Sequence, residues 1–299
     1  MTAEGKKERF AKVISVYNRK GGVGKSYLSI SLAGYLAKNT KNRVLYLDMD
    51  SQCDTSKHYL GLSEEIMSSD PATYKSLLNI PGIKNEQYGI DIPQLSWDNL
   101  LFKAPHYGLF TIMPSKSLDR YWDMAENTKG RIDIIYEFIN TIRDKFDYII
   151  INLGPRDNDV TLNALCASDY VLLATNPEVS SLDGIKDFYT GFWPIIKNFN
   201  PYCECLGLVI NRYDSRSHAG FYNHEAKSMA EEYGFHIFES KIPNCTGIGN
   251  ALSEDFKEAA KSNAPVLFFH PYFGRRFKST QMAMTILIMD IIIRMETDQ

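Results

Sequence analysis

Hydrophobic residues along the chain fall into short runs, separated by longer stretches with helical spacing. The runs are continuous and rich in β-branched residues, which is typical of strands buried on both faces of a sheet. We predict strands at Val13–Tyr17, Val44–Leu47, Leu109–Met113, Tyr148–Ile151, Tyr170–Ala174, Leu206–Ile210 and Phe235–Phe238. Helical patterns lie between them, at Ser26–Lys38, Arg131–Lys145, Asp159–Ala167, Ser181–Lys197 and His218–Tyr233.

This alternation predicts an α/β fold with a doubly wound, mostly parallel sheet and helices on both faces. Sheets of this kind bind ligands at the carboxyl ends of their strands. The proline-rich stretch 54–105 interrupts the pattern, and we interpret it as a loop-rich insertion with short helices around Thr73–Leu78 and Trp97–Phe102. With a C-terminal helix around 276–295, we expect residues 1–299 to form a single domain.

Composition narrows the class of protein. The chain has 299 residues, of which 44% are hydrophobic and 23% charged, and these proportions exclude a disordered tail or a repetitive fibre. Lys+Arg 33 against Asp+Glu 36 leaves a net charge of −3, so binding to nucleic acid would need a local basic patch. The 5 cysteines lack framework spacing, and the first residues lack an apolar segment. We therefore expect a cytoplasmic protein.

A glycine-rich loop, N-R-K-G-G-V-G-K-S at Asn18–Ser26, joins the first predicted strand to the first predicted helix. Its glycines let the backbone curl so that N–H groups point into an anion-binding concavity, closed by a helix N-terminus. The motif assigns Lys25 to phosphate oxygens and the Ser26 hydroxyl to Mg²⁺. The alternative is an ordinary glycine turn before a helix, against which the order of strand, loop and helix argues.

The loop departs from the common G-x-x-x-x-G-K-[ST] pattern, because Arg19 replaces the first glycine and Lys20 follows it. K-G-G-x-G-K-[ST] is the deviant Walker A loop, and here the chain resembles the ParA/MinD family of dimerising P-loop ATPases. The resemblance implies ATP and Mg²⁺ as cofactors. It also implies that Lys20 is the signature lysine that reaches the ATP of the partner subunit, which couples ATP binding to dimerisation. The implied phosphate-binding residues are Lys20, Gly21, Gly22, Val23, Gly24, Lys25, Ser26 and Tyr27.

Two aspartates, Asp48 and Asp50, close the second predicted strand and lie on the same side of it. The segment resembles the family's D-x-D-P-Q motif, with Ser51 in place of proline. The resemblance implies that Asp48 orders a Mg²⁺-bound water and that Asp50 holds the attacking water. Aspartates at strand ends also serve as caps or turn formers, and this alternative stays open on the residues alone.

The fourth predicted strand ends in Asn152, where the family's Walker B strand ends in aspartate. An amide keeps an acceptor oxygen but lacks the charge that helps to hold hydrated Mg²⁺. We predict that Asn152 weakens Mg²⁺ coupling or slows hydrolysis while ATP binding is retained.

The resemblance extends over most of the chain. Gly108–Ser115 resembles the family's G-L-x-x-I-P-[AS] strand, and the length of the 54–105 insertion favours the ParA branch over the MinD branch. Asn211 and Arg212 match the loop beside the adenine base, and Pro243 lies in a segment that resembles the I-P-R turn on its other face. The same loop resembles a guanine-reading N-K-x-D motif, but Arg212 stands where that motif needs lysine.

Basic residues near the C-terminal end form a candidate patch for nonspecific DNA. They are Lys257, Lys261, Arg275, Arg276 and Lys278. Pairing such a patch across a dimer doubles its phosphate contacts. An ordinary solvated surface is the alternative.

Two further features have structural interpretations that we favour. The apolar run Gln281–Met295 resembles a membrane anchor of the MinD type, but its acidic, lysine-free character favours packing on the core. Cys203 and Cys205 would supply only half of a metal site, so we expect buried thiols.

Taken with its motifs, the resemblance implies an ATP-dependent dimerising ATPase of DNA or cargo partitioning. Its expected partners are a second copy of the chain, nonspecific DNA and a ParB-like activator of slow ATP hydrolysis, and its expected location is on the nucleoid. Two alternatives are an ATP-gated scaffold with negligible hydrolysis because of Asn152, and a membrane-associated positioning factor of the MinD type.

Overall fold

The computed structural model of the chain describes residues 10–40, 42–58, 60, 101–103, 109–112, 119, 122–123, 130–214, 219–245 and 274–297. The predicted helix at Thr73–Leu78 and the candidate DNA contacts Lys257 and Lys261 lie outside these residues.

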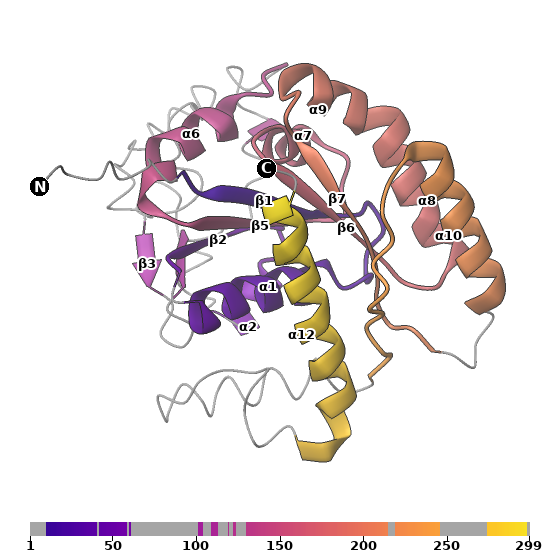
Figure 1. The fold of residues 1–299 in the computed structure, drawn as a ribbon. Helices are drawn as coiled ribbons and strands as arrows, with labels where there is room; N and C mark the ends of the chain where they lie inside the picture. The colour runs from indigo at the N-terminus through magenta and orange to yellow at the C-terminus, as the bar shows by residue number, and fades with distance from the viewer. Residues whose placement is uncertain are drawn as a thin grey trace, which may run out of the picture.

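A twisted sheet forms the centre of the molecule (Figure 1). In the described ranges its strands are β1 (Lys12–Tyr17), β2 (Val44–Met49), β3 (Leu101–Lys103), β4 (Phe110–Ile112), β5 (Tyr148–Leu153), β6 (Tyr170–Thr175) and β7 (Glu204–Ile210). Their order is β3-β4-β2-β5-β1-β6-β7, and every neighbouring pair is parallel except β3 and β4. The predicted doubly wound, mostly parallel sheet is confirmed.

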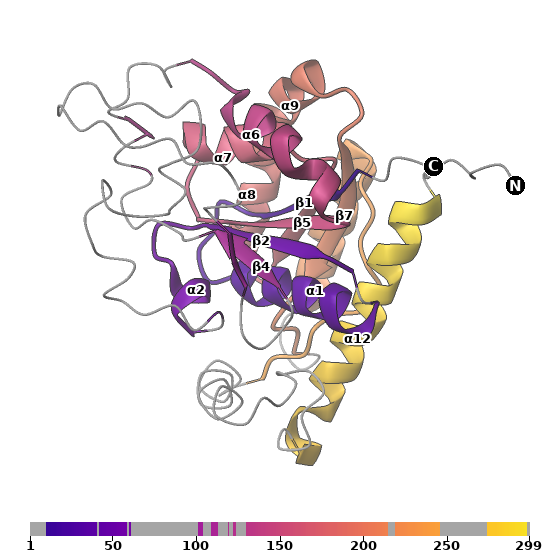
Figure 2. The ribbon, with the colours of Figure 1, turned by 90° about the vertical axis from the view of Figure 1, so that its left-hand side faces the viewer.

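Helices cover both faces of this sheet, as the two views show (Figures 1 and 2). One face carries α1 (Lys25–Asn39), α2 (Asp54–His58) and α12 (Gly274–Thr297). The other carries α6 (Ile134–Ile142), α7 (Asp159–Cys166), α8 (Val179–Asp187), α9 (Trp193–Phe199) and α10 (Ala219–Tyr233). Neighbouring residues of a strand enter different cores: Val13 packs in one hydrophobic cluster and Ile14 in the other. This explains the continuous apolar runs of the sequence.

Two predicted elements are wrong, and a third is modified. Phe235–Phe238 is not a strand: it forms only an isolated bridge between Ile237 and Leu208, and its apolar residues reflect burial rather than pairing. The helix expected around Trp97–Phe102 is contradicted at its end, because Leu101–Lys103 pairs antiparallel with β4. The helix predicted at Ser181–Lys197 is divided by a π-helical turn at Phe188–Phe192.

The long helix α12 packs on the sheet beside α1 (Figure 2). Met284, Leu287 and Ile291 of its inner side are buried in the same core as α1. At its C-terminal end the carbonyl of Met295 accepts a hydrogen bond from Lys12 Nζ at 2.6 Å, so this end lies near the start of β1. The prediction that this helix packs on the core is therefore correct for one of its sides. None of the helices in the described part of the chain is long and apolar enough to cross a membrane.

Candidate nucleotide site at the carboxyl edge of the sheet

The glycine-rich loop leaves β1 at its carboxyl end and turns directly into α1. Gly22 and Gly24 have φ angles of 77° and 96°, which lie in the left-handed region that favours glycine. Gly24 is the N-cap of α1, and as a glycine it offers no side-chain acceptor to the first turn of the helix. Among the described residues, the N–H groups of Gly22, Gly24, Lys25 and Ser26 have no acceptor. The loop therefore offers several unused backbone donors at a helix N-terminus.

The two lysines of the loop lie in different surroundings. Lys25 is only 6% exposed, and its Nζ donates to the carbonyl of Lys20 at 3.1 Å. Burial lowers the pKa of Lys25 to about 8, while the nearby Asp50 carboxylate acts in the opposite direction. The Lys20 side chain is half-buried and makes no hydrogen bond or ion pair within the described ranges. One lysine thus belongs to the loop, whereas the other is available to a ligand or a partner.

Two side chains of the loop itself, Asn18 and Arg19, tie its start to distant parts of the chain. Asn18 Nδ2 donates to the carbonyls of Ala174 and Ser181, at 2.7 and 3.1 Å, and its Oδ1 accepts from the N–H of Lys20 at 2.8 Å. Arg19 forms ion pairs with Asp157 and Asp187. Arg19, which replaces the first glycine of the common motif, therefore ties the loop to α8 and to the segment after β5.

The segment after β7 lies against the other side of the loop. Asn211 Nδ2 donates to the carbonyl of Val23 at 2.9 Å, and a Cβ atom on Gly24 would come within 2.0 Å of that nitrogen. Arg212 follows with a φ of 52°, and a parallel bridge then joins Tyr213 to Pro243. The two segments expected on either side of the base are therefore neighbours, and one of them touches the phosphate loop.

Asp48 and Asn152 are register partners on β2 and β5 and lie behind the loop. Asp48 is buried, and its carboxylate accepts from Asn152 Nδ2 at 2.9 Å and from the N–H and hydroxyl of Ser56 at 3.0 and 2.7 Å. The oxygen of Asn152 accepts from Ser29 Oγ of α1 at 3.2 Å. Burial raises the pKa of Asp48 to about 6, although these hydrogen bonds favour its charged form. At position 152, where the family has a second carboxylate, this chain thus has an amide that donates a hydrogen bond to the buried carboxylate of Asp48.

Asp50 directly follows β2, two residues after Asp48, and lines a cavity of about 240 Å³. Its carboxylate accepts from the N–H of Gln52 at 3.0 Å, and a Cβ on Gly154 would come within 3.3 Å of its Oδ1. Among the lining residues that the sequence did not predict are three charged or amide side chains, those of Asp119, Arg156 and Asn158. Asp119 accepts from Asn158 at 3.0 Å and pairs with Arg156 at 3.3 Å. The signal for the latter two was their place just after the carboxyl end of β5, where ligands of such sheets bind.

The remaining predicted residues lie elsewhere or have other surroundings. Lys278 is exposed on α12, and the backbone of Arg275 and Arg276 belongs to the first turns of the same helix. Cys203 is buried and Cys205 half-buried, and burial raises the pKa of both thiols. The described residues contain no cluster of three or more histidine, cysteine or acidic side chains that would hold a metal.

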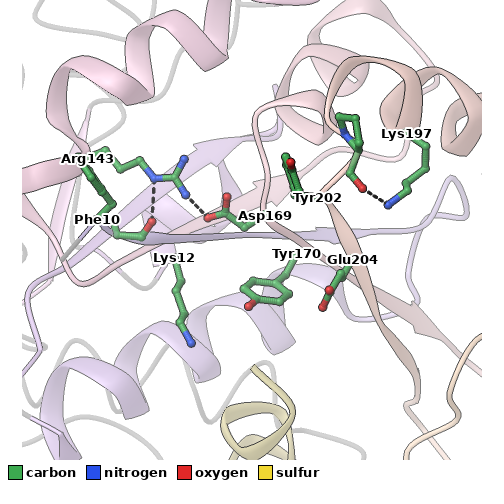
Figure 3. A pocket seen from close by; sticks show the side chains of 10 residues that line it. Phe10, Lys12, Arg143, Asp169, Tyr170, Lys197, Tyr202 and Glu204 are labelled. Carbon is green, nitrogen blue, oxygen red and sulfur yellow. Dashed lines mark hydrogen bonds and ion pairs between the residues drawn. The ribbon is translucent and has the colours of Figure 1, made fainter. Parts of the chain in front are cut away.

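A second hollow, of about 460 Å³, lies at the opposite, amino edge of the sheet (Figure 3). Its cations already have partners. Arg143 donates to the carbonyl of Ala11 at 3.0 Å and pairs with Asp169, Lys12 donates to Met295, and Lys197 donates to the carbonyl of Cys203 at 3.0 Å. These contacts connect the starts of β1, β6 and β7, and each cation uses part of its hydrogen-bonding capacity within the protein.

The donors of the carboxyl edge fit a nucleotide triphosphate with a hydrated Mg²⁺. Unused N–H groups and two lysines match phosphate oxygens. Hard oxygen ligands suit Mg²⁺, and the Ser26 hydroxyl at the helix start and the Asp48 carboxylate are of this type. The site therefore has the features of a P-loop nucleotide-binding site.

Comparison with known proteins places the chain in a family. A family model described as AAA domain matches residues 11–205, so the chain belongs to this family. Over 232 residues the chain is 26% identical to the chromosome partitioning protein ParA of Myxococcus xanthus, covering 78% of this chain and 75% of that protein. The resemblance to ParA-type ATPases is thereby confirmed.

Solved structures share the fold at low sequence identity. The structure of pNOB8 ParA bound to nonspecific DNA matches with a TM-score of 0.66 and 22% identity, covering 97% of this chain and 100% of that chain. Cobyrinic acid a,c-diamide synthase of Mycobacterium smegmatis, with bound ATP analog and magnesium, matches with a TM-score of 0.63 and 22% identity, covering 86% and 99%. Because the same fold serves these different proteins, the function has to be argued from the site.

Proposed function

We propose that the protein is a partitioning ATPase that binds ATP and Mg²⁺ at the carboxyl edge of the sheet. The loop N–H groups and Lys25 hold the phosphates, and Ser26 and Asp48 orient the hydrated metal. Asn211, Arg212 and Pro243 flank the base. The relationship to a chromosome partitioning protein and the fold shared with a structure holding an ATP analog and magnesium both support this assignment.

The proposal further includes a homodimer that forms on ATP binding, with Lys20 reaching the phosphates held by the other subunit. One observation carries it: Lys20 lies at the rim of a phosphate loop, and its ammonium group is not engaged by any residue that the structure describes. In this proposal the buried Lys25 binds the triphosphate of its own subunit. A second, free cation gains most when a partner brings another triphosphate to it.

Molecular mass in solution tests this role of Lys20. Gel filtration with light scattering is run at a protein concentration low enough for the nucleotide-free chain to be monomeric. The samples contain ADP, a nonhydrolysable ATP analogue, or the analogue plus DNA. We expect monomers with ADP and dimers with the analogue. Lys20→Ala is expected to keep the analogue bound but to remain monomeric, while Lys227→Ala, an exposed lysine on α10, behaves like the wild type. Normal dimerisation of Lys20→Ala would contradict the proposal.

In the proposed reaction, Asp50 orients the attacking water beside the 240 Å³ cavity, and Lys20 and Lys25 stabilise the charge that develops on the phosphates. A ParB-like partner accelerates this slow step and releases the monomers. Asp50→Ala is expected to retain analogue binding and dimerisation but to lose phosphate release. Loss of binding in this variant would show that Asp50 has another role.

A second candidate is an ATP-gated scaffold with negligible turnover. The observation that favours it is the amide at position 152, which leaves Asp48 without a carboxylate neighbour across the β2–β5 pair. Phosphate release in the presence of DNA and the partner separates the two functions, because the scaffold releases none.

Nonspecific DNA binding by the ATP dimer, and with it a nucleoid location, is the last part of the proposal. It is supported by the shared fold with a ParA bound to nonspecific DNA and by the basic first turns of α12. A charge-reversed Arg275→Glu/Arg276→Glu variant is expected to weaken DNA binding and to flatten its dependence on salt. An unchanged salt dependence would exclude these residues.

A further inference from the structure

Helix α12 carries an exposed apolar stripe on the side that faces away from the core. Met282, Ile286, Met289 and Ile293 are 56%, 56%, 48% and 56% exposed. Their spacing of four, three and four residues places them on one face of the helix, in the pattern of a coiled-coil seam. Four large apolar side chains in one line on a helix whose other side is fixed to the core indicate a contact surface.

A charged residue lies at each end of this stripe, and the two charges have opposite signs. Lys278 lies one turn before Met282, and Glu296 lies one turn after Ile293; both are exposed. Neither makes an ion pair within the described ranges. The stripe therefore has a cationic end, an apolar middle and an anionic end.

We propose that this α12 stripe pairs with the α12 stripe of a second copy of the chain, with the two helices antiparallel. A twofold rotation then sets Met282 against the partner's Ile293 and Ile286 against the partner's Met289. At each end it brings Lys278 of one copy beside the partner's Glu296. Asp290 lies opposite the partner's Thr285, so no like charges meet.

Parallel pairing lacks this complementarity, because it sets Lys278 against Lys278 and Glu296 against Glu296. The antiparallel arrangement also opposes the helix dipoles favourably. It gives an isologous contact, in which one patch meets its own copy. Four half-exposed side chains per copy make a small interface compared with the ~1,200 Å² or more of stable dimers, so the pairing is weak and depends on protein concentration.

The α12 pairing is independent of the nucleotide site. The helix lies on a lateral face beside α1, and its C-terminal end approaches the amino edge of the sheet through Lys12 and Met295. It needs neither ATP nor Lys20. Its failure and that of the proposed ATP dimer are therefore distinguishable.

Sedimentation velocity without nucleotide or DNA tests the pairing over a range of protein concentrations; DNA is left out because Lys278 is also a candidate DNA contact. We expect a reversible monomer–dimer equilibrium in the wild type and in Lys20→Ala. Ile286→Glu is expected to weaken association by about tenfold or more, because it buries charge at the centre of the contact. Ile195→Glu, at an exposed apolar position of α9, is the matched control and leaves association unchanged.

A charge exchange identifies the partner surface. Lys278→Glu and Glu296→Lys each create like-charge neighbours and weaken association, whereas the double variant restores it. Thermal unfolding by circular dichroism shows that each variant is folded. A wild type that stays monomeric at every concentration, or a double variant no better than the singles, overturns the proposal. Co-sedimentation of a monomeric wild type with phosphatidylcholine–phosphatidylglycerol vesicles, abolished by Ile286→Glu, would assign the stripe to a membrane surface instead.

Discussion

The two edges of the central sheet hold similar side chains but differ in what those side chains already contact. At the amino edge, Arg143, Lys12 and Lys197 surround a hollow of about 460 Å³, and each has an acceptor within the protein. At the carboxyl edge, Lys20 and the N–H groups at the start of α1 have none in the described ranges. Unused hydrogen-bonding capacity therefore distinguishes a binding site better than volume or charge does.

The largest effect expected from this difference is on nucleotide affinity. Lys25→Ala removes a buried cation from the phosphate loop and is expected to weaken binding of a fluorescent ATP analogue by about 100-fold, a charge-assisted hydrogen-bond effect. Lys12→Ala, at the amino edge, is expected to change the affinity by less than twofold. Equal losses in the two variants would show that the edges do not differ in this way.

The amino edge is expected to matter for stability instead. Arg143→Ala leaves the partly buried Asp169 without its ion pair and removes a bond to the carbonyl of Ala11. The free energy of unfolding should fall by about 2 kcal/mol, as urea denaturation measures. A double-mutant cycle with Asp169→Ala isolates the pair, and nucleotide affinity is expected to stay unchanged throughout.

The depressed pKa of Lys25 predicts a pH dependence that only the carboxyl edge produces. With a pKa of about 8 before phosphate binds, Lys25 is mostly protonated at pH 7 and mostly neutral at pH 9. Phosphate requires the charged form, so affinity falls as pH rises through 8, by about tenfold between pH 7 and pH 9. Calorimetric titration at the two values measures the change. Lys25→Ala is the control, because it should lose this pH dependence.

The smallest effect concerns Asn152. Asn152→Asp introduces a second carboxylate beside Asp48, which strengthens the field at the hydrated metal. The Mg²⁺ concentration for half-maximal turnover is expected to fall by about fivefold, while affinity for the nucleotide in EDTA stays constant. Superimposable Mg²⁺ titrations of the two proteins would remove position 152 from any part in metal coupling.

The site was predictable where its determinants are contiguous or share a sheet register. The glycines and lysines of the loop stand at neighbouring positions, so the turn from β1 into α1 could be placed directly from the sequence. The adjacency of Asp48 and Asn152 follows because parallel strands end at the same edge. Asp119 was missed because it reaches the Asp50 cavity from a distant part of the chain.

The wrong predictions of secondary structure have a common physical cause. A pattern of apolar residues indicates that a segment is buried, but it does not indicate whether the segment is a strand, a helix or a loop. Phe235 and Phe238 are buried beside β7 without forming a strand. Leu101 and Phe102 belong to an edge strand rather than a helix. Apolar residues occur on nearly every side of α12, so its sequence could not separate the packed side from the exposed Met282 and Ile286.

The close approach of Gly24 and Asn211 makes the glycine-rich loop depend on a distant part of the chain. Only a hydrogen atom on the Cα of Gly24 leaves room for the Asn211 amide, and the amide nitrogen donates one of its two hydrogens to the carbonyl of Val23. A methyl group at position 24 would therefore push this amide away and remove the bond. A single missing side chain thus keeps the loop and the segment after β7 in one fixed arrangement.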